Sequence, residues 1–252
     1  MVNGLSHRRT IHTSRRERDR WHHGGVAVRA VLFDFSGTLF RLEEDESWFD
    51  GMVVDDREVD GHVQTELLRR LTAPTGRSVD MTEEAAHAWE NRDLAPYLHR
   101  EAYLHVLRES GLTDEHAESL YGRVVDPDSW TPYPDTADVL AGLRRRGLRT
   151  AVVSNIAFDV RPAFARIGAD RDVDEFVLSF EVGATKPDPR IFRTALQRLD
   201  VTAEDAVMVG DSDEADGGAR AVGCRFVLVD PLPTAERPTG LRDALAGIGI
   251  ES

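Results

Sequence analysis

Short runs of three or four consecutive apolar residues recur along the chain, once near residue 30 and then repeatedly after residue 150. Runs of this length, bounded by polar residues or glycine, are typical of strands buried on both faces of a parallel sheet. We therefore predict five strands, which in chain order are Ala30–Phe33, Ala151–Val153, Phe176–Leu178, Ala206–Val209 and Arg225–Val229.

Between these strands the apolar residues recur at helical spacing. One helix is predicted from Thr136 through Leu143 with Gly147 at its end, and a second covers Ala163 to Ile167. Two more are predicted through Ile191–Leu199 and from about Glu214 to Val222. Strands that alternate with helices of this length form right-handed βαβ units, so the sequence predicts a doubly wound α/β core with a parallel sheet.

Residues 41–130 have a different pattern, in which apolar residues recur every three or four positions and no strand-like alternation is seen. Thr113 is placed to cap one of the resulting helices. We predict an all-helical domain inserted at 41–130 into a core formed by 28–40 and 131–252.

The 252-residue chain has a net charge of −14, although residues 1–25 are basic. We interpret residues 1–27 as a disordered extension. The acidity of the remainder argues against nucleic-acid binding, and no apolar run approaches the ~18–20 residues of a membrane span. The single cysteine, Cys224, excludes an internal disulfide and fits a structural thiol in a cytoplasmic protein.

Polar side chains follow three of the predicted strands, where α/β proteins bind ligands. The first strand leads into Asp34-Phe-Ser36-Gly37-Thr38, the second into Ser154-Asn155, and the fourth into Gly210-Asp211, with Asp216 five residues later. Lys186-Pro-Asp-Pro189 precedes a predicted helix and contains the only lysine of the chain. In a composition so biased toward arginine, this suggests that a compact ammonium group is required at position 186.

In this order and at these spacings, the four segments resemble the motifs of haloacid dehalogenase-like (HAD) hydrolases. The resemblance covers about residues 28–40 and 131–230. It implies a Rossmann-like core with a cap domain inserted after the first motif. It also implies a phosphatase-type, Mg²⁺-dependent hydrolase that acts on a small phosphorylated metabolite.

The resemblance assigns roles to individual residues. Asp34 is expected to be the nucleophile that forms an aspartyl-phosphate. Asp34 and Asp211 are expected to meet at the sheet edge and bind Mg²⁺. Two neighbouring carboxylates suggest this role on chemical grounds as well. The resemblance adds the main-chain carbonyl of Ser36 as a third Mg²⁺ ligand. The remaining assignments are Lys186, Ser154 and Asn155 for phosphate binding, Thr38 for orienting the nucleophile, and Gly37, Gly210 and Asp216 as supporting residues.

Ser36 departs from the family pattern. Most phosphatases of this family have a second Asp there, which protonates the leaving oxygen and then activates water. Haloacid dehalogenases have Tyr at this position and lack the counterpart of Asp211, so this chain does not fit that chemistry. Phosphonoacetaldehyde hydrolases need a lysine in the cap, and residues 41–130 contain no lysine. P-type ATPases have Thr there, which resembles Ser36 in chemistry.

Several alternatives follow from Ser36. The enzyme hydrolyses its aspartyl-phosphate slowly, or Asp216 or a cap carboxylate replaces the missing base, or the acceptor is not water. If the acceptor is not water, the protein is a phosphotransferase. An acyl-phosphate hydrolase is another alternative, because the leaving group of an acyl phosphate needs no protonation. A catalytically weak phosphate-binding protein is a further possibility. The sequence indicates neither the substrate nor whether the protein is a monomer or a homodimer.

Overall fold

Five parallel strands form the central sheet, and the first strand of the chain lies in the middle of it. The computed structural model describes residues 28–43, 46–49, 51–54, 57–58, 61–71 and 79–251, so the predicted extension at 1–27 lies outside the described residues. Across the sheet the strands are β7 (Glu175–Leu178), β6 (Arg149–Ser154), β1 (Ala30–Phe33), β8 (Ala206–Gly210) and β9 (Arg225–Leu228). All five predicted strands are confirmed, each to within two residues at its ends.

The order in which successive strands are added to the sheet reverses at β1, while all five strands stay parallel. It builds β6 and β7 on one side of β1, then returns to build β8 and β9 on the other. Such a reversal creates the crevice in which α/β proteins bind ligands. Phe33 lies beside Val152 of β6 and Val209 of β8, so Asp34, Ser154 and Asp211 all follow at the same edge of the sheet.

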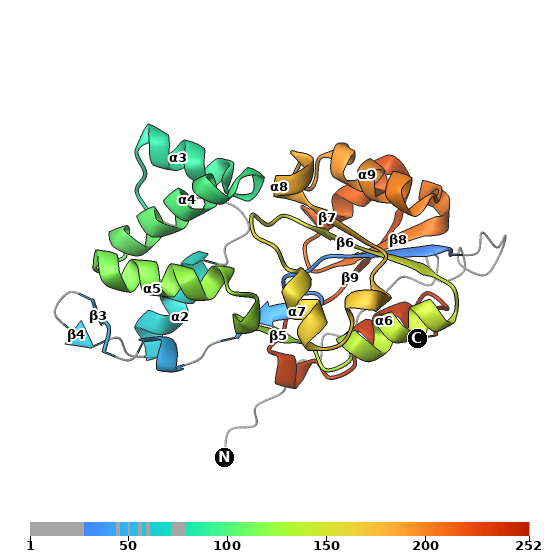
Figure 1. Ribbon diagram of the computed structural model, residues 1–252, viewed down its shortest axis with the longest axis horizontal. Helices are drawn as coiled ribbons and strands as arrows, with labels where there is room; N and C mark the ends of the chain where they lie inside the picture. The colour runs from blue at the N-terminus through green and yellow to red at the C-terminus, as the bar shows by residue number, and fades with distance from the viewer. Residues whose placement is uncertain are drawn as a thin grey trace, which may run out of the picture.

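Helices cover both faces of the sheet (Figure 1). Val31 and Phe33 of β1 contribute to one apolar cluster, and Ala30 and Leu32 to the other. The first cluster includes α6 (Thr136–Arg145), α7 (Arg161–Arg166) and α10 (Gly240–Ala246); the second includes α9 (Pro189–Leu199) and η6 (Asp216–Val222). The alternation along β1 is that of a strand buried on both faces, and the doubly wound fold is confirmed.

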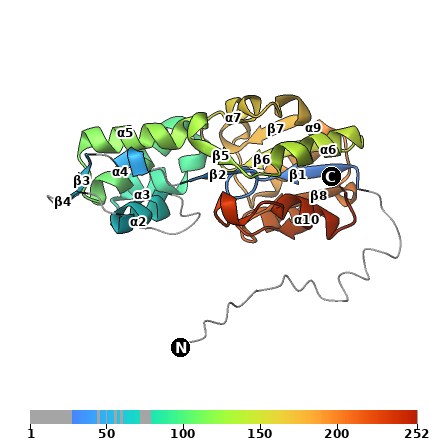
Figure 2. The ribbon, with the colours of Figure 1, turned by 90° about the horizontal axis from the view of Figure 1, so that it is seen from below.

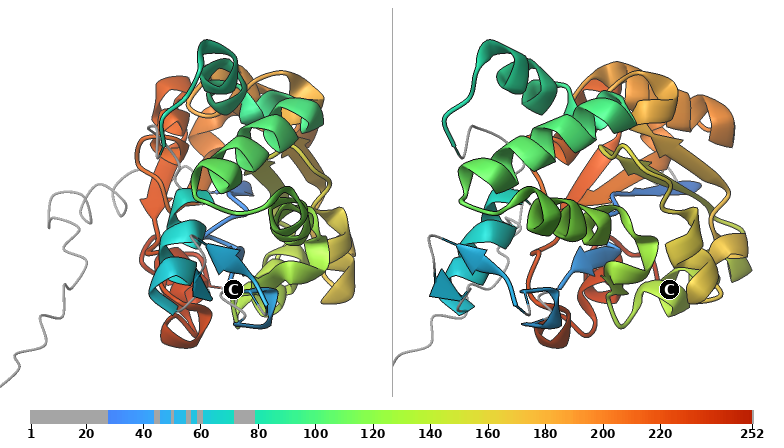
Figure 3. Two further views of the ribbon diagram at one scale, coloured as in Figure 1. Left: turned by 90° about the vertical axis from the view of Figure 1, so that its left-hand side faces the viewer. Right: turned by 60° about the vertical axis from the view of Figure 1, so that its left-hand side comes forward.

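The insert forms a separate lobe beside the sheet (Figures 1 and 2). Its helices are α2 (Gly61–Leu71), α3 (Glu83–Glu90), η2 (Arg92–Leu94), α4 (Pro96–Glu109) and α5 (Asp114–Val125). Thr82 and Thr113 cap α3 and α5, each accepting a hydrogen bond from the main chain three residues later. The two views in Figure 3 bring this lobe forward and show its helices arranged in front of the core.

One correction concerns the expectation that the insert is all-helical. The short strands β3 (Val53–Val54) and β4 (Arg57–Glu58) pair in an antiparallel hairpin. Two-residue strands are too short to leave a recognisable alternation in the sequence. In addition, β2 (Phe40–Leu42) pairs with β5 (Trp130–Pro132), so both predicted domain boundaries fall inside a ribbon that joins core and insert.

Four aromatic rings pack where this ribbon meets the core. Phe35 lies 5.0 Å from both Phe40 and Trp130, measured between ring centroids, and Phe40 lies 4.9 Å from Phe164. Phe164 belongs to α7 and is fully buried. The cluster therefore fixes the loop after β1 against both the ribbon and a core helix.

Phe164→Ala is expected to lower the free energy of unfolding by about 3–5 kcal/mol, because it removes a fully buried ring whose space the neighbouring rings fill only in part. Denaturant unfolding followed by circular dichroism measures this change. Tyr97→Ala is the matched control, since the Tyr97 side chain is 70% exposed and its loss should be close to neutral. Equal stabilities for the two variants would contradict the prediction.

Candidate active site

Asp34 is fixed at the end of β1 by the main chain around it. Its N–H donates a hydrogen bond of 3.0 Å to the carbonyl oxygen of Val209 in β8. Three residues later the chain turns sharply, with Gly37 at a φ of 75° and its N–H bonded to the carbonyl of Phe40. Glycine adopts this left-handed conformation without a steric penalty, so the predicted tight turn is present.

Lys186 lies between two carboxylates. Its ammonium nitrogen is 2.5 Å from Oδ1 of Asp34 and 2.6 Å from Oδ1 of Asp216, and all three side chains are almost completely buried. Asn155 holds the Lys186 main chain in place, because its side chain accepts a hydrogen bond from the Lys186 N–H at 2.6 Å and donates one to the Lys186 carbonyl at 2.9 Å. Asn155 therefore acts on Lys186, whereas the sequence suggested direct contact with phosphate.

Asp216 is positioned by an irregular turn. Its second carboxylate oxygen accepts a hydrogen bond of 3.0 Å from the Ser212 N–H. The segment predicted as a helix from Glu214 is a 3₁₀-helix that begins at Asp216. Gly217 and Gly218 weaken α-helix formation here. Gly210 is required at the end of β8, since a Cβ at that position would lie 2.1 Å from the Asp216 carboxylate.

These contacts shift the pKa values of the buried groups. Burial raises the pKa of Asp34 to about 8, with the Lys186 ammonium opposing the shift and Asp216 and Asp211 adding to it. Burial also raises the pKa of Asp211, and the negative charge of Asp216 adds to that effect. For Lys186, burial by itself lowers the pKa, but Asp216 and Asp34 together outweigh it and hold the pKa above its ordinary value. The cluster thus keeps its ammonium charged.

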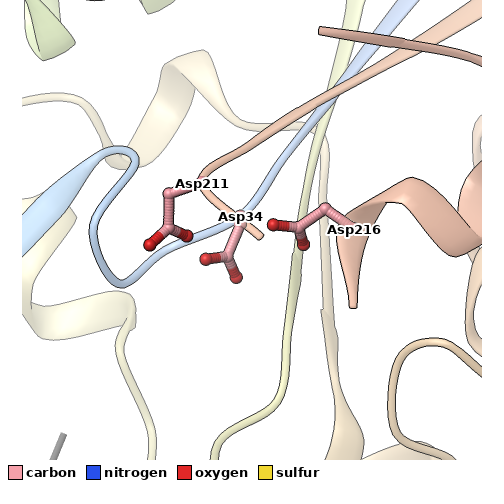
Figure 4. Close-up of side chains that lie close together, drawn as sticks. All are labelled: Asp34, Asp211 and Asp216. Atoms are coloured by element: carbon pink, nitrogen blue, oxygen red, sulfur yellow. The ribbon is translucent and has the colours of Figure 1, made fainter. Parts of the chain in front are cut away.

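Three carboxylates meet at this edge of the sheet with one ammonium group among them. Oxygens of Asp34, Asp211 and Asp216 lie within 4.8 Å of one another (Figure 4). Gly37 leaves room for Asp211, because a Cβ there would lie 2.4 Å from Oδ2 of Asp211. Since both oxygens of Asp216 bond to protein groups, Asp34 and Asp211 are the carboxylates suited to a hard divalent cation.

A cavity of about 1060 Å³ opens above these residues, between core and insert. From the core it is lined by Asp34, Ser36, Ser154, Asn155, Lys186 and Asp211, and from the insert by Arg92, Asp93, His99 and Tyr103. The Ser36 side chain is exposed to the cavity, whereas Thr38 is completely buried. The Thr38 hydroxyl has no hydrogen-bond partner among the described residues, so no contact supports its expected role in orienting Asp34.

Arg237 is a supporting residue that the sequence did not reveal. Its guanidinium donates a hydrogen bond of 2.7 Å to the carbonyl of Gly37 and another to the carbonyl of Thr38. It also lies over the Tyr133 ring, 3.1 Å from the centroid. Arg237 thereby clamps the loop after β1 from the far end of the chain. Only chain folding brings it there, and no motif surrounds it. The insert residues that line the cavity likewise reach it only through chain folding and stand in no recognisable motif.

The fold and this arrangement agree with comparisons to known proteins. Residues 28–223 match the family described as hydrolase, haloacid dehalogenase-like hydrolase. The chain belongs to this family. The predicted resemblance is confirmed, and with it the expectation that the protein is a HAD-like hydrolase.

Several curated relatives match part of the chain. Haloacid dehalogenase-like hydrolase domain-containing protein 3 of Mus musculus is 37% identical over 55% of this chain and 59% of its own length. Phosphoserine phosphatase of Thermus thermophilus is 36% identical over 65% of each chain. Ribulose-1,5-bisphosphate 5-phosphatase of Halopiger xanaduensis is 41% identical over 39% of this chain and 42% of its own. This HAD hydrolase thus spans less than two thirds of the length of these relatives.

Solved structures confirm the fold. A dehalogenase aligns with a TM-score of 0.60 at 23% identity, covering 82% of this chain and 86% of that one. L-2-haloacid dehalogenase of Xanthobacter autotrophicus aligns with a TM-score of 0.57 at 23% identity, covering 85% and 82%. Among the described residues of this HAD hydrolase, no helix has the length and apolar character needed to cross a bilayer.

Gly210→Ala is expected to displace Asp216 from Lys186 and to lower the activity of the folded protein, because the added methyl group would occupy the position of the Asp216 carboxylate. Gly122→Ala is the matched control. Gly122 lies within α5 with open space around it, so alanine there should retain activity and stabilise the helix by up to about 1 kcal/mol. Thermal unfolding and phosphatase assays on both variants test this. An active Gly210→Ala protein would contradict the assigned role of this glycine.

Proposed function

We propose that this protein is a Mg²⁺-dependent phosphatase that hydrolyses a small phosphate monoester through an aspartyl-phosphate on Asp34. The observation that carries this proposal is the buried Lys186 ammonium bonded to Asp34 at the switch point of the sheet, with Asp211 beside it. A carboxylate held in this way is oriented for in-line attack on phosphorus.

Each residue of the site has a role in this reaction. Lys186 orients Asp34 and offers positive charge to the phosphoryl oxygens, and the Ser154 hydroxyl donates a hydrogen bond to the same group. Asn155 and Asp216 keep Lys186 in position. Asp34, Asp211 and the main-chain carbonyl of Ser36 are the proposed Mg²⁺ ligands. When bound, Mg²⁺ would neutralise charge on the transferring phosphoryl group.

The relatives support a small phosphorylated metabolite as the substrate class. Three of them are named for phosphoserine, ribulose 1,5-bisphosphate and glyceraldehyde 3-phosphate. These compounds share a phosphate ester and differ in the rest of the molecule. We therefore infer the phosphate ester as the common element and assign the choice of leaving group to the residues of the insert that line the cavity.

A second candidate function follows from Ser36, whose side chain faces the cavity without the carboxyl group that most phosphatases of this family have at this position. An acyl phosphate needs no protonation of its leaving group, and a phosphotransferase passes the phosphoryl group to an alcohol. A phosphate-binding protein with weak activity would retain the same contacts. Dehalogenation fits less well, because that chemistry does not call for the paired carboxylates of Asp34 and Asp211.

Asp34→Asn is expected to reduce hydrolysis of p-nitrophenyl phosphate to the uncatalysed background, because an amide is nearly isosteric with the carboxylate but is not a competent nucleophile. Release of p-nitrophenolate measures the rate. Asp213→Asn is the matched control, since Asp213 lines the same cavity but its carboxylate is exposed and paired with Arg220. Turnover within a few-fold of wild type for Asp34→Asn would refute the covalent mechanism.

Asp211→Asn is expected to weaken Mg²⁺ binding by about tenfold or more, because loss of even an outer-shell partner typically costs ~10–100-fold. Titration calorimetry of the chelator-treated protein with Mg²⁺ measures the affinity independently of activity. Asp213→Asn should bind Mg²⁺ as the wild type does. Full phosphatase activity in chelator-treated wild type would show that no divalent cation takes part.

A further inference from the structure

The proposed phosphatase needs a group that transfers protons, and the core does not supply one. Ser36 has only a hydroxyl, which is a poor acid and a poor base near neutral pH. Asp216 is not available, because one carboxylate oxygen bonds to Lys186 at 2.6 Å and the other accepts the Ser212 N–H at 3.0 Å. Asp34 and Asp211 have their own roles as nucleophile and metal ligand.

Among the residues that the structure describes, four further carboxylates line the cavity. Glu43 accepts a hydrogen bond of 2.7 Å from the Thr234 N–H, and Asp213 is paired with Arg220 at 2.7 Å. Glu214 is exposed to solvent. The fourth is Asp93, which the insert contributes from η2 and whose side chain is 19% exposed. Among the described residues, the cation nearest to its carboxylate is Arg92, whose Nε lies 4.0 Å from Oδ2 of Asp93, beyond hydrogen-bond distance.

The main chain of Asp93 is fastened directly to the catalytic core. Its carbonyl oxygen accepts a hydrogen bond of 2.5 Å from the Ser179 hydroxyl, and the same hydroxyl oxygen accepts the Ile156 N–H at 2.9 Å. Ile156 follows Ser154, which is proposed to bind the phosphoryl group, and Asn155, which holds the Lys186 main chain. A residue of the insert is thus held against the loop that forms one wall of the phosphate site.

The surroundings of Asp93 suit proton transfer near neutral pH. Burial raises its pKa to about 6, while the positive charges of Arg92 and Lys186 oppose the shift. Among the described insert residues that line the cavity, the other titratable side chains are His99 and Tyr103 on α4. Burial lowers the pKa of His99 to about 3 and raises that of Tyr103 to about 12, so both stay neutral across this range. A group with a pKa near the working pH transfers protons most effectively.

We propose, on the basis of the proposed phosphatase function, that Asp93 is the general acid–base of this enzyme and replaces the carboxyl group that is missing at position 36. In the first step an Asp34 oxygen bonds to phosphorus while the bond from phosphorus to the leaving oxygen breaks, and protonated Asp93 gives its proton to that oxygen. In the second step the Asp93 carboxylate takes a proton from water. The water oxygen bonds to phosphorus, the bond to Asp34 breaks, and inorganic phosphate is released.

The test compares wild type with Asp93→Asn on two substrates. With p-nitrophenyl phosphate, whose leaving group needs no proton, Asp93→Asn should release a burst of one p-nitrophenolate per enzyme and then turn over ~10²–10⁴-fold more slowly than wild type, which shows no burst. With ethyl phosphate, whose leaving group needs the proton, the variant should show no burst and a similar loss of rate. Intact-protein mass spectrometry should detect the phosphorylated variant during slow turnover.

Two further variants separate catalysis from structure. Glu214→Gln removes an exposed carboxylate from the same cavity and should behave as the wild type does. Adding Ser36→Asp to Asp93→Asn should raise the rate of the slow step by about tenfold or more, because it returns a carboxyl group to the usual position. The Ser179 contact uses the main chain of Asp93 and is unchanged by the asparagine, so the variant should fold.

The outcomes are distinct. A burst in Asp93→Asn that is relieved by Ser36→Asp supports the proposal. Wild-type rates in Asp93→Asn on both substrates overturn it, and so does a loss of rate without a burst that Ser36→Asp does not relieve. Wild-type protein that releases no phosphate from either substrate in the presence of Mg²⁺ contradicts the proposed function itself, and the role of Asp93 with it.

Discussion

One buried ammonium group holds the site together. Lys186 bonds to Asp34, which follows β1, and to Asp216, which follows β8, from a segment that precedes α9. Burying these charges is costly unless they are paired, and removing one partner of such a group typically costs ~3–5 kcal/mol. The three segments are therefore fixed relative to one another by the same contacts that orient the proposed nucleophile.

Such close approach is possible only where side chains are absent. Gly37 makes room for Asp211, and Gly210 makes room for Asp216. Gly218 allows the main chain after Asp216 to pass Pro187, whose Cβ would lie 2.6 Å from a Cβ at position 218. These glycines differ in conformation, since only Gly37 has a positive φ. Their shared role is to let the ends of neighbouring strands converge on one small volume.

The core and the insert divide the proposed chemistry between them. The core supplies the proposed nucleophile, the Lys186 ammonium group and the carboxylates proposed to bind a cation, all at the edge of the sheet. The insert closes the cavity, and its Asp93 is joined to the core through Ser179. A proton carrier on the insert would act only when insert and core are together around a substrate. In this arrangement the part that selects the leaving group would also supply its proton.

The sequence by itself determined the five strands, the doubly wound fold and most of the candidate site, because each of those residues stands at the end of an apolar run or in a local motif. It did not predict the β3–β4 hairpin or the 3₁₀ turn at Asp216, where the elements are short and side-chain contacts decide the backbone. Only the tertiary structure brought Arg237 and Asp93 to the site, and only it directed Asn155 to the Lys186 main chain. These contacts join segments far apart in the chain, and no local pattern records which side chains will meet once the sheet and the insert have packed.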